Sequence, residues 1–301
     1  MTTIFKSLLF AAAAACTWPA HALNVVTCEP EWASLVKELG GDKVSVSSAT
    51  TALQDPHHIE ARPSLIARMR NADLLVCTGM ELEIGWLPLL LQQSGNARLA
   101  VGAPANFEAG RYITPLEVPS RVDRSEGDVH AAGNPHIQLD PRNIQKVATA
   151  LAARMGQVDP ADAALYQQRL AAFSTRWSAA IAKWEKQAQP LRGVAVVAHH
   201  KNMTYLWNWL GIREIATLEP KPGVEPSGGY LSELNARLAQ QPAKMVVRAA
   251  YEDPRASQWL SEHAHIPAVV LPFTVGGNDK ASDVFGLFDS SIELLLHGAA
   301  P

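Results

Sequence analysis

The sequence lacks the features that mark membrane-spanning chains, nucleic-acid-binding proteins and helical zinc hydrolases. Beyond the first 22 residues, no apolar run approaches the roughly 20 residues that a membrane-spanning helix needs. The 26 Lys and Arg residues are outnumbered by 29 Asp and Glu residues, so no basic surplus favours nucleic acid or an anionic membrane. No His-Glu-x-x-His motif occurs. These absences argue against a membrane-embedded protein, a nucleic-acid partner and a metalloprotease.

The first 22 residues have the pattern of a secretory signal peptide. Lys6 is their only charged residue, an apolar run from Ser7 to Cys16 follows, and Ala20-His21-Ala22 fits the small-residue cleavage pattern. We therefore expect cleavage after Ala22 and an exported, soluble chain. Cys16 could instead accept a lipid, but Ala13 stands where the lipidation signal usually has Leu. We do not expect lipid anchoring.

Cysteine is scarce, with three residues in the whole sequence. Two of them, Cys28 and Cys77, lie beyond the expected signal peptide. An oxidising compartment would permit a disulfide between them. Alternatively, Cys77 is an unpaired residue buried in an apolar strand. Both interpretations stay open, because the sequence does not give the distance between the two side chains.

Strand patterns and helical patterns alternate along both halves of the chain. In the first half, strand patterns at 24–28, 44–46 and 72–79 alternate with helical patterns at 31–39, 64–71 and 82–93. In the second half, strand patterns at 193–198, 244–247 and 268–271 alternate with helical patterns near 205–210, 231–240, 254–263 and 283–296. Such alternation is typical of βα units around a mostly parallel sheet. We therefore predict an α/β fold with two lobes.

One helical pattern is much longer than the others. It begins at Asp159-Pro160, an N-cap followed by Pro at the first helical position, and Pro190 ends it. About 30 residues at 1.5 Å each span roughly 45 Å, which exceeds the need of one small lobe. We interpret this segment as a rigid helix that joins two lobes. The expected division is a signal peptide (1–22), an N-terminal lobe (23–156), the linking helix (157–190) and a C-terminal lobe (191–301).

Histidines that follow strand patterns form the candidate site. Asp55-Pro56-His57 and Asn134-Pro135-His136 each place a His directly after Pro, whose fixed φ lets the backbone aim the ring. His200 follows an apolar strand pattern, and Asp279 lies in a Gly-rich loop. In parallel α/β lobes, ligands collect where strands end and loops begin. We therefore predict a metal site in the cleft between the lobes, formed by His57, His136, His200 and Asp279.

The residues alone do not choose within two pairs of adjacent histidines. His57 is followed by His58, and His200 is preceded by His199. One member of each pair would be a ligand, and the other would have a structural role or none. Spacing within the chain does not decide between them.

Two further alternatives concern the fourth ligand. Asp283 competes with Asp279, although Asp283 is also well placed to cap the last helix. His130 lies near the end of a stretch, 107–133, that lacks apolar periodicity and is rich in Asp, Glu, Arg, Gly and Ser. We expect this stretch to be an exposed loop. His130 could be a weak collecting ligand on that loop or a solvated side chain.

Four stretches of the chain carry a recognisable pattern. They are Asp55-Pro56-His57 with Glu60 and Pro63-Ser64, Ala72-Asp73-Leu74-Leu75-Val76 through Trp86-Leu87, Asn134-Pro135-His136 through Leu139-Asp140-Pro141, and His200 through Tyr205 and Leu210-Gly211. Together they resemble the substrate-binding proteins of zinc and manganese ABC importers, the cluster A-I family. The resemblance selects His57 over His58, because the family's ligand directly follows the proline. It selects His200 over His199 through the spacing to Gly211.

The chain departs from the family pattern in three places. Gln138 stands where the family usually has Trp, and the 107–133 loop has a single His where zinc members often have many. The region of the fourth ligand is also shifted, since the family pattern has an Asp at the start of the last helix. This departure leaves Asp279 and Asp283 as alternatives.

The resemblance implies two (β/α) lobes that move little on binding, joined by a long helix. It implies capture of a divalent transition metal in the periplasm, zinc before manganese, and delivery to the membrane permease of an ABC transporter. We expect a monomer without a nucleic-acid partner. Three imidazoles and one carboxylate complete a tetrahedral set, so we expect no enzymatic activity. The alternative from another class is a secreted zinc hydrolase, which needs an open coordination position and a general base such as Glu60 or Glu83.

Overall fold

The structure is a computed structural model that describes residues 22–121, 127 and 129–300. Nearly all of the expected signal peptide lies outside the described residues. The same holds for Cys16 and for any lipid attached to it.

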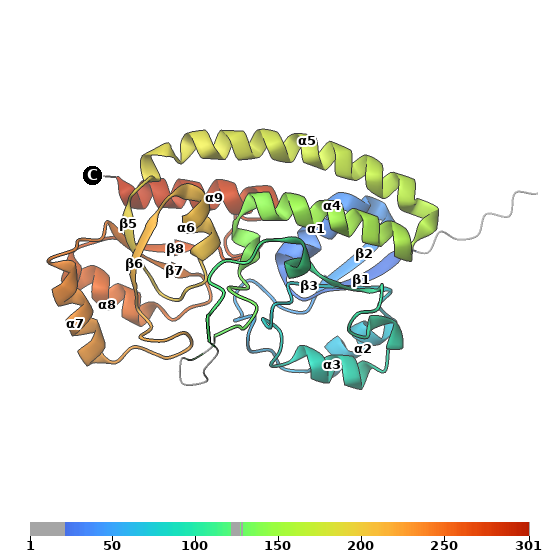
Figure 1. Ribbon diagram of the computed structural model, residues 1–301, viewed down its shortest axis with the longest axis horizontal. Helices are drawn as coiled ribbons and strands as arrows, with labels where there is room; N and C mark the ends of the chain where they lie inside the picture. Colours follow the sequence, from blue (N-terminus) through green and yellow to red (C-terminus); the bar gives the residue numbers. More distant parts are fainter. Residues whose placement is uncertain (1–21, 122–126, 128, 301) are drawn as a thin grey trace, which may run out of the picture.

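Two parallel four-stranded sheets lie side by side, each covered by helices (Figure 1). The first sheet has the strand order β2-β1-β3-β4, and the second has the order β6-β5-β7-β8. The strands are β1 (Leu23–Thr27), β2 (Val44–Ser48), β3 (Leu74–Cys77), β4 (Asn106–Glu108), β5 (Ala195–Ala198), β6 (Arg213–Thr217), β7 (Met245–Ala249) and β8 (Ala268–Leu271). Because each half places its second strand outside its first, the two lobes have the same strand order. The predicted α/β fold with two parallel lobes is confirmed.

The helices among the described residues are α1 (Pro30–Gly40), α2 (Pro63–Asn71), α3 (Leu87–Ser94), α4 (Pro141–Val158), α5 (Ala163–Gln187), α6 (Thr204–Leu210), α7 (Gly228–Leu238), α8 (Pro254–Ala264) and α9 (Val284–Ala299). Helices α1–α3 and α6–α8 connect successive strands within the lobes, α4 and α5 lead from the first lobe to the second, and α9 follows the last strand. Several of them, including α1, α2, α4 and α8, have Pro in the first turn, where no backbone N–H is needed for the helix. Within the described ranges, no helix is long and apolar enough to cross a membrane.

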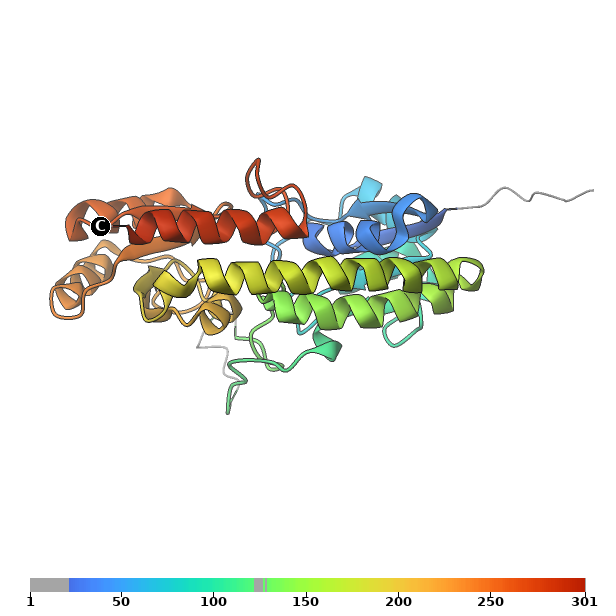
Figure 2. The same cartoon turned by 90° about the horizontal axis from the view of Figure 1, so that it is seen from above.

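The long helix α5 runs along both lobes. It has 25 residues; it runs lengthwise over α9 and α4 in Figure 1, and Figure 2 shows it between those two helices. Its buried aromatic face packs on α9, with ring centroids 4.7 Å apart for Trp177 and Phe285 and 5.1 Å apart for Trp184 and Phe288. The predicted linking helix is therefore present. It starts later than expected, because α4 extends to Val158 and a 3-10 turn at Pro160–Asp162 separates the two helices.

A disulfide joins Cys28 and Cys77 in the first lobe. The parallel pairing of β1 with β3 places Thr27 opposite Val76. Cys28 and Cys77 directly follow these two residues and therefore lie next to each other. The two Cα atoms are 4.7 Å apart although 49 positions separate the residues in sequence. The disulfide interpretation is confirmed, and both cysteines are also fully buried.

Three local predictions differ from the structure. The short edge strands β4 and β6 were not expected, and β4 lies at the start of the stretch predicted to be a loop. The third helix begins at Leu87 instead of Leu82. The reason is a series of turns in which Met80 and Glu81 have positive φ angles of 55° and 68°.

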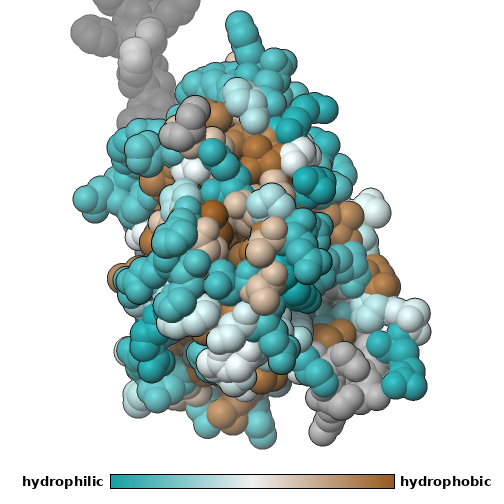
Figure 3. Space-filling view, turned by 90° about the vertical axis from the view of Figure 1, so that its left-hand side faces the viewer, coloured by the Kyte–Doolittle hydropathy of each residue, from teal (hydrophilic) through white to brown (hydrophobic). Residues whose placement is uncertain are grey.

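The surface at the end of the second lobe is mostly hydrophilic (Figure 3). Apolar side chains appear there in small separate areas, as is usual for a globular surface.

Candidate metal centre

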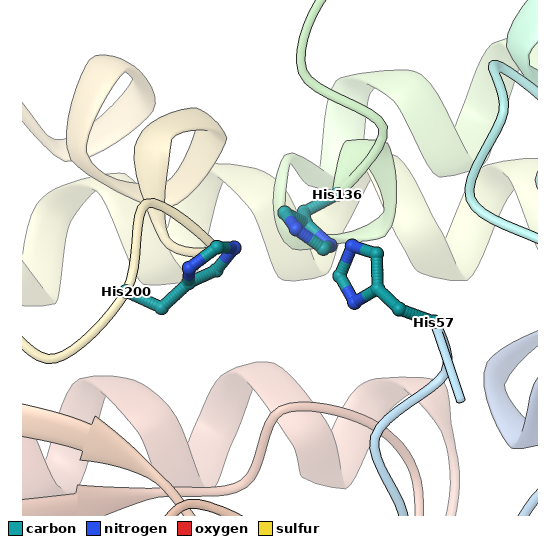
Figure 4. A group of neighbouring side chains, drawn as sticks. All are labelled: His57, His136 and His200. Atoms are coloured by element: carbon teal, nitrogen blue, oxygen red, sulfur yellow. The ribbon is translucent and has the colours of Figure 1, made fainter. Parts of the chain in front are cut away.

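Three histidines from three separate loops meet between the two lobes, with their rings turned towards one another (Figure 4). His57 lies in the segment between β2 and α2, His136 directly precedes a 3-10 turn at Ile137–Leu139, and His200 follows β5. One ligand atom from each ring lies within 4.8 Å of the other two. The ring centroids are 5.3 Å apart for His57 and His136, 5.7 Å for His136 and His200, and 5.9 Å for His57 and His200. The structure thus brings together three of the four predicted ligands.

The two X-Pro-His segments owe their shape to the residue before the proline as well as to the proline itself. The side chain of Asp55 accepts the backbone N–H of His57 at 2.9 Å, and that of Asn134 accepts the backbone N–H of His136 at 3.0 Å. These are Asx turns, which hold the backbone in a fixed bend. Asn134 also donates to the carbonyl of Lys201 at 2.7 Å. One amide therefore positions His136 and binds the residue that follows His200.

A carboxylate fixes the orientation of His57. The Nδ1 atom of His57 lies 2.7 Å from Oδ1 of Asp55. Burial would raise the pKa of Asp55, but the hydrogen bonds and charge of His57, together with the charge of His58, outweigh burial and lower that pKa below the usual value. Asp55 is therefore an ionised acceptor, and Nδ1 of His57 carries the proton. This leaves Nε2 of His57 as the atom that can bind a metal.

His200 is held in the same way from the second lobe. Its Nδ1 lies 2.6 Å from Oε2 of Glu219, and the same oxygen accepts the N–H of Gly223 at 2.9 Å. Burial lowers the pKa of His200, but the hydrogen bond and the charge of Glu219 raise it above the usual value, with help from Glu252 and Asp55. The available ligand atom is again Nε2.

His136 has a different environment. Its side chain is buried, and its Nδ1 has no hydrogen-bond partner among the described residues. Burial lowers its pKa well below the usual value, and the neighbouring imidazoles of His57, His200 and His130 lower it further. The ring of Phe273 contacts it edge to face, with centroids 5.4 Å apart. His136 is therefore neutral, as a metal ligand must be.

Neither predicted carboxylate is brought into this group. Asp279 is exposed, and the side chain of the neighbouring Asn278 accepts the N–H groups of Lys280 and Ala281. Asp283 caps α9, where its Oδ1 accepts the N–H of Gly286 at 2.8 Å. It lines a separate cavity of about 780 Å³ between α1, β2 and the loop before α9. The structure thus places both Asp279 and Asp283 outside the histidine group.

His130 lies closer to the histidine group than the sequence indicated. Its Nε2 is 3.3 Å from Nε2 of His57, and the two rings are stacked with centroids 5.3 Å apart. By contrast, His58 is exposed and His199 lies outside the group, in line with the selection of His57 and His200. The signal for His130 was its position a few residues before Asn134-Pro135-His136, in a loop that also contains Gly133.

The residues that a hydrolase would need do not face the histidines. Glu60 is exposed, and Glu83 accepts the N–H groups of Thr78 and Gly79 at 2.8 Å and 3.0 Å. Within the described residues, the other group with the spacing of a metal site is Cys28, Cys77 and Glu83. Its two sulfurs are joined in a disulfide and offer no thiolate.

Comparison with known proteins places this geometry in context. A family model described as "ZnuA: Zinc-uptake complex component A periplasmic" matches residues 25–296. The manganese ABC transporter substrate-binding lipoprotein PsaA of Streptococcus pneumoniae is 23% identical over 261 residues, which cover 84% of this chain and 80% of PsaA. The high-affinity zinc uptake system protein ZnuA of Paracoccus denitrificans is 24% identical over 286 residues, with 83% and 84% covered.

The fold has close counterparts among solved structures. A crystal structure of ZnuA superposes with a TM-score of 0.77 at 22% identity, and the match covers 93% of this chain and 100% of that one. The relatives are substrate-binding proteins of transport systems and not enzymes. Several, including PsaA, are named lipoproteins, so they lend no support to the expectation that Cys16 carries no lipid.

Proposed function

Because the chain belongs to the ZnuA family of periplasmic metal-binding components of ABC importers, we propose that it captures zinc between its lobes and delivers it to a membrane permease. The family holds both zinc and manganese proteins, so capture of a divalent metal for import is the common property. The observation that carries the proposal is the meeting of His57, His136 and His200 at one point between the two sheets. Manganese is the alternative cargo.

The chemistry of the three rings supports zinc as the cargo. Asp55 and Glu219 each hold one ring with Nε2 left available, and burial keeps the third ring neutral. Neutral imidazole nitrogen is a good ligand for Zn²⁺, whereas Mn²⁺ prefers carboxylate, carbonyl and water oxygens. A group with three nitrogens and no carboxylate therefore favours zinc.

The position of the rings supports a carrier. His57 and His136 come from the first half of the chain, and His200 comes from the second. Release of the metal can therefore begin when the ligands of one lobe separate from it. Among the described residues, the two acids that contact the rings, Asp55 and Glu219, are each hydrogen-bonded to a ligand histidine and so are not placed as general bases. We propose that the protein acts as a monomer and has no nucleic-acid partner.

Titration calorimetry of the chelator-stripped protein tests this function. We expect one zinc ion per chain and a higher affinity for zinc than for manganese. His57→Ala should weaken zinc binding by at least about tenfold, because a ligand is lost. The matched control is His58→Ala, which removes the adjacent exposed ring and should leave the affinity unchanged. A stoichiometry near zero for both metals would contradict the proposal.

A further inference from the structure

We infer that His130 is the fourth protein ligand of the captured metal, and that the resulting set of four imidazoles makes the site selective for zinc over manganese. This inference rests on the proposed metal-binding function and specifies its cargo. The fourth position then belongs to the loop that precedes Asn134-Pro135-His136 and not to the loop before α9.

The distance between His130 and His57 matches that of two ligands on one zinc ion. Tetrahedral zinc with Zn–N bonds of about 2.0–2.1 Å separates two ligand nitrogens by about 3.3–3.4 Å. The Nε2 atoms of His130 and His57 are 3.3 Å apart. Because Nδ1 of His57 donates to Asp55, its Nε2 is an acceptor, and Nε2–H of His130 is the donor in this contact. A metal ion would replace that proton, which would pass to Nδ1 of His130 or to water.

The backbone holds His130 beside the site. The N–H of Ala131 donates to the carboxylate of Glu81 at 2.7 Å, and the N–H of Gly133 donates to the carbonyl of His130 at 3.1 Å. His130 also lines a cavity of about 350 Å³ together with His136 and His200. His130 is not part of the group formed by His57, His136 and His200, whose ligand atoms all lie within 4.8 Å of one another. Its ring therefore has to turn towards His136 and His200 when the metal enters.

Three carboxylates among the described residues near the histidines, those of Asp55, Glu219 and Glu252, already accept hydrogen bonds. Asp55 accepts from His57, and Glu219 accepts from both His200 and Gly223. Glu252 accepts the N–H of Ala249 at 2.6 Å, and its other oxygen accepts from Asn202 at 2.9 Å. Using any of them as a ligand would break a hydrogen bond that orients a ligand ring or a buried loop.

A set of four nitrogens has a consequence for selectivity. Imidazole suits zinc, whereas manganese is favoured by oxygen ligands. Replacement of the fourth nitrogen by a carboxylate oxygen should therefore shift the preference towards manganese. This makes His130 a residue that decides specificity as well as affinity.

Variants at position 130 test the inference on the full chain after removal of metal by a chelator. Zinc and manganese affinities are measured by competition with an indicator dye for the wild type, His130→Ala, His130→Asp and the control His58→Ala. We expect His130→Ala to weaken zinc binding at least about tenfold, with a smaller change for manganese. His130→Asp should recover part of the zinc affinity and lower the zinc-to-manganese affinity ratio at least about tenfold. His58→Ala should change neither affinity by more than about twofold.

X-ray absorption at the zinc edge measures the number of imidazoles bound to zinc. This number would not change if His130 had a structural role only. The number of imidazoles around zinc should fall from four in the wild type to three in His130→Ala. An equal number in both proteins overturns the inference, even if the affinity falls. If His130→Ala binds zinc normally while His57→Ala does not, His130 is no ligand and the proposed function stands. If His57→Ala also binds zinc normally, the proposed function itself is wrong.

Discussion

The two lobes have the same strand order but are stabilised by different means. In the first lobe a disulfide joins the ends of β1 and β3, and the acids Glu29, Glu31 and Glu83 are buried near those ends. The second half of the sequence contains no cysteine. The loops that carry His57 and His136 thus belong to a lobe whose sheet is cross-linked. The ligand of the second lobe is held by one carboxylate on a loop.

This difference indicates a division of roles between the lobes. The first lobe supplies His57 and His136 on Asx turns whose bends are fixed locally. The second lobe supplies His200, whose ring depends on Glu219. Glu219 also accepts from Gly223, so the same side chain links the ring to the loop beside the site. We therefore expect substitutions to affect stability mainly in the first lobe and metal affinity more in the second.

The largest effect is expected from loss of the disulfide. Replacing Cys28 and Cys77 together by Ala should lower the free energy of unfolding by about 2–4 kcal/mol, because the unfolded chain regains the freedom of a long loop. Urea unfolding monitored by circular dichroism measures this change. The matched control is the wild type under a reducing agent, which should lose a similar amount. If neither the double variant nor the reduced wild type shows a changed unfolding midpoint, the disulfide does not stabilise the first lobe and the proposed difference between the lobes is wrong.

The next effect concerns the buried acids of the first lobe. Burial raises the pKa of Glu31 and of Glu83 to about 7. Between pH of about 4.5 and 7, these groups are protonated in the folded state and ionised in the unfolded state. The folded state therefore binds more protons in this window. Stability should be highest below it and should fall as the pH rises towards 7, by on the order of 1–3 kcal/mol for each group.

Glu31→Gln tests this pH dependence. Gln keeps an acceptor for the hydroxyl of Thr274, which donates to Glu31 from the loop before α9, but it has no charge to bury. We expect the variant to be more stable than the wild type at pH 8 and to lose part of the decline between pH 5 and pH 8. Glu262→Gln, at an exposed position of α8, should leave the wild-type profile unchanged. A Glu31→Gln profile identical to the wild type would refute the assignment.

A smaller effect is expected from the acids that orient the ligand histidines. Glu219→Ala should weaken zinc binding by about 10- to 100-fold, and Asp55→Ala should weaken it less. The order follows from exposure, since 14% of the Glu219 side chain is exposed against 39% for Asp55. Chelator competition on both variants measures the ratio. Equal losses, or a larger loss for Asp55→Ala, would contradict the greater dependence of the second lobe on its carboxylate.

The sequence was informative where local patterns determine the structure. Alternating strand and helix patterns predicted two parallel sheets, and the X-Pro-His segments predicted two rings that the structure brings together. The short edge strands β4 and β6 were missed because their apolar patterns are weak: β4 has three residues, and β6 has no fully buried residue. Their existence depends on neighbours that are distant in sequence.

The fourth ligand could not be identified from local sequence patterns. Asp279 was chosen because it lies in a loop at the end of a strand, yet it is exposed and lies outside the histidine group. His130 is held near His57 through contacts of its neighbours with Glu81 and within its own turn. These are tertiary contacts, and no spacing in the sequence encodes them.

A crystal structure of the zinc-loaded protein, with anomalous scattering recorded at the zinc edge, tests the central claim most directly. The account predicts one zinc peak between the lobes, about 2.0–2.1 Å from a nitrogen of His57, His136 and His200. A zinc ion bound elsewhere on the chain, with these three rings unoccupied, would contradict it.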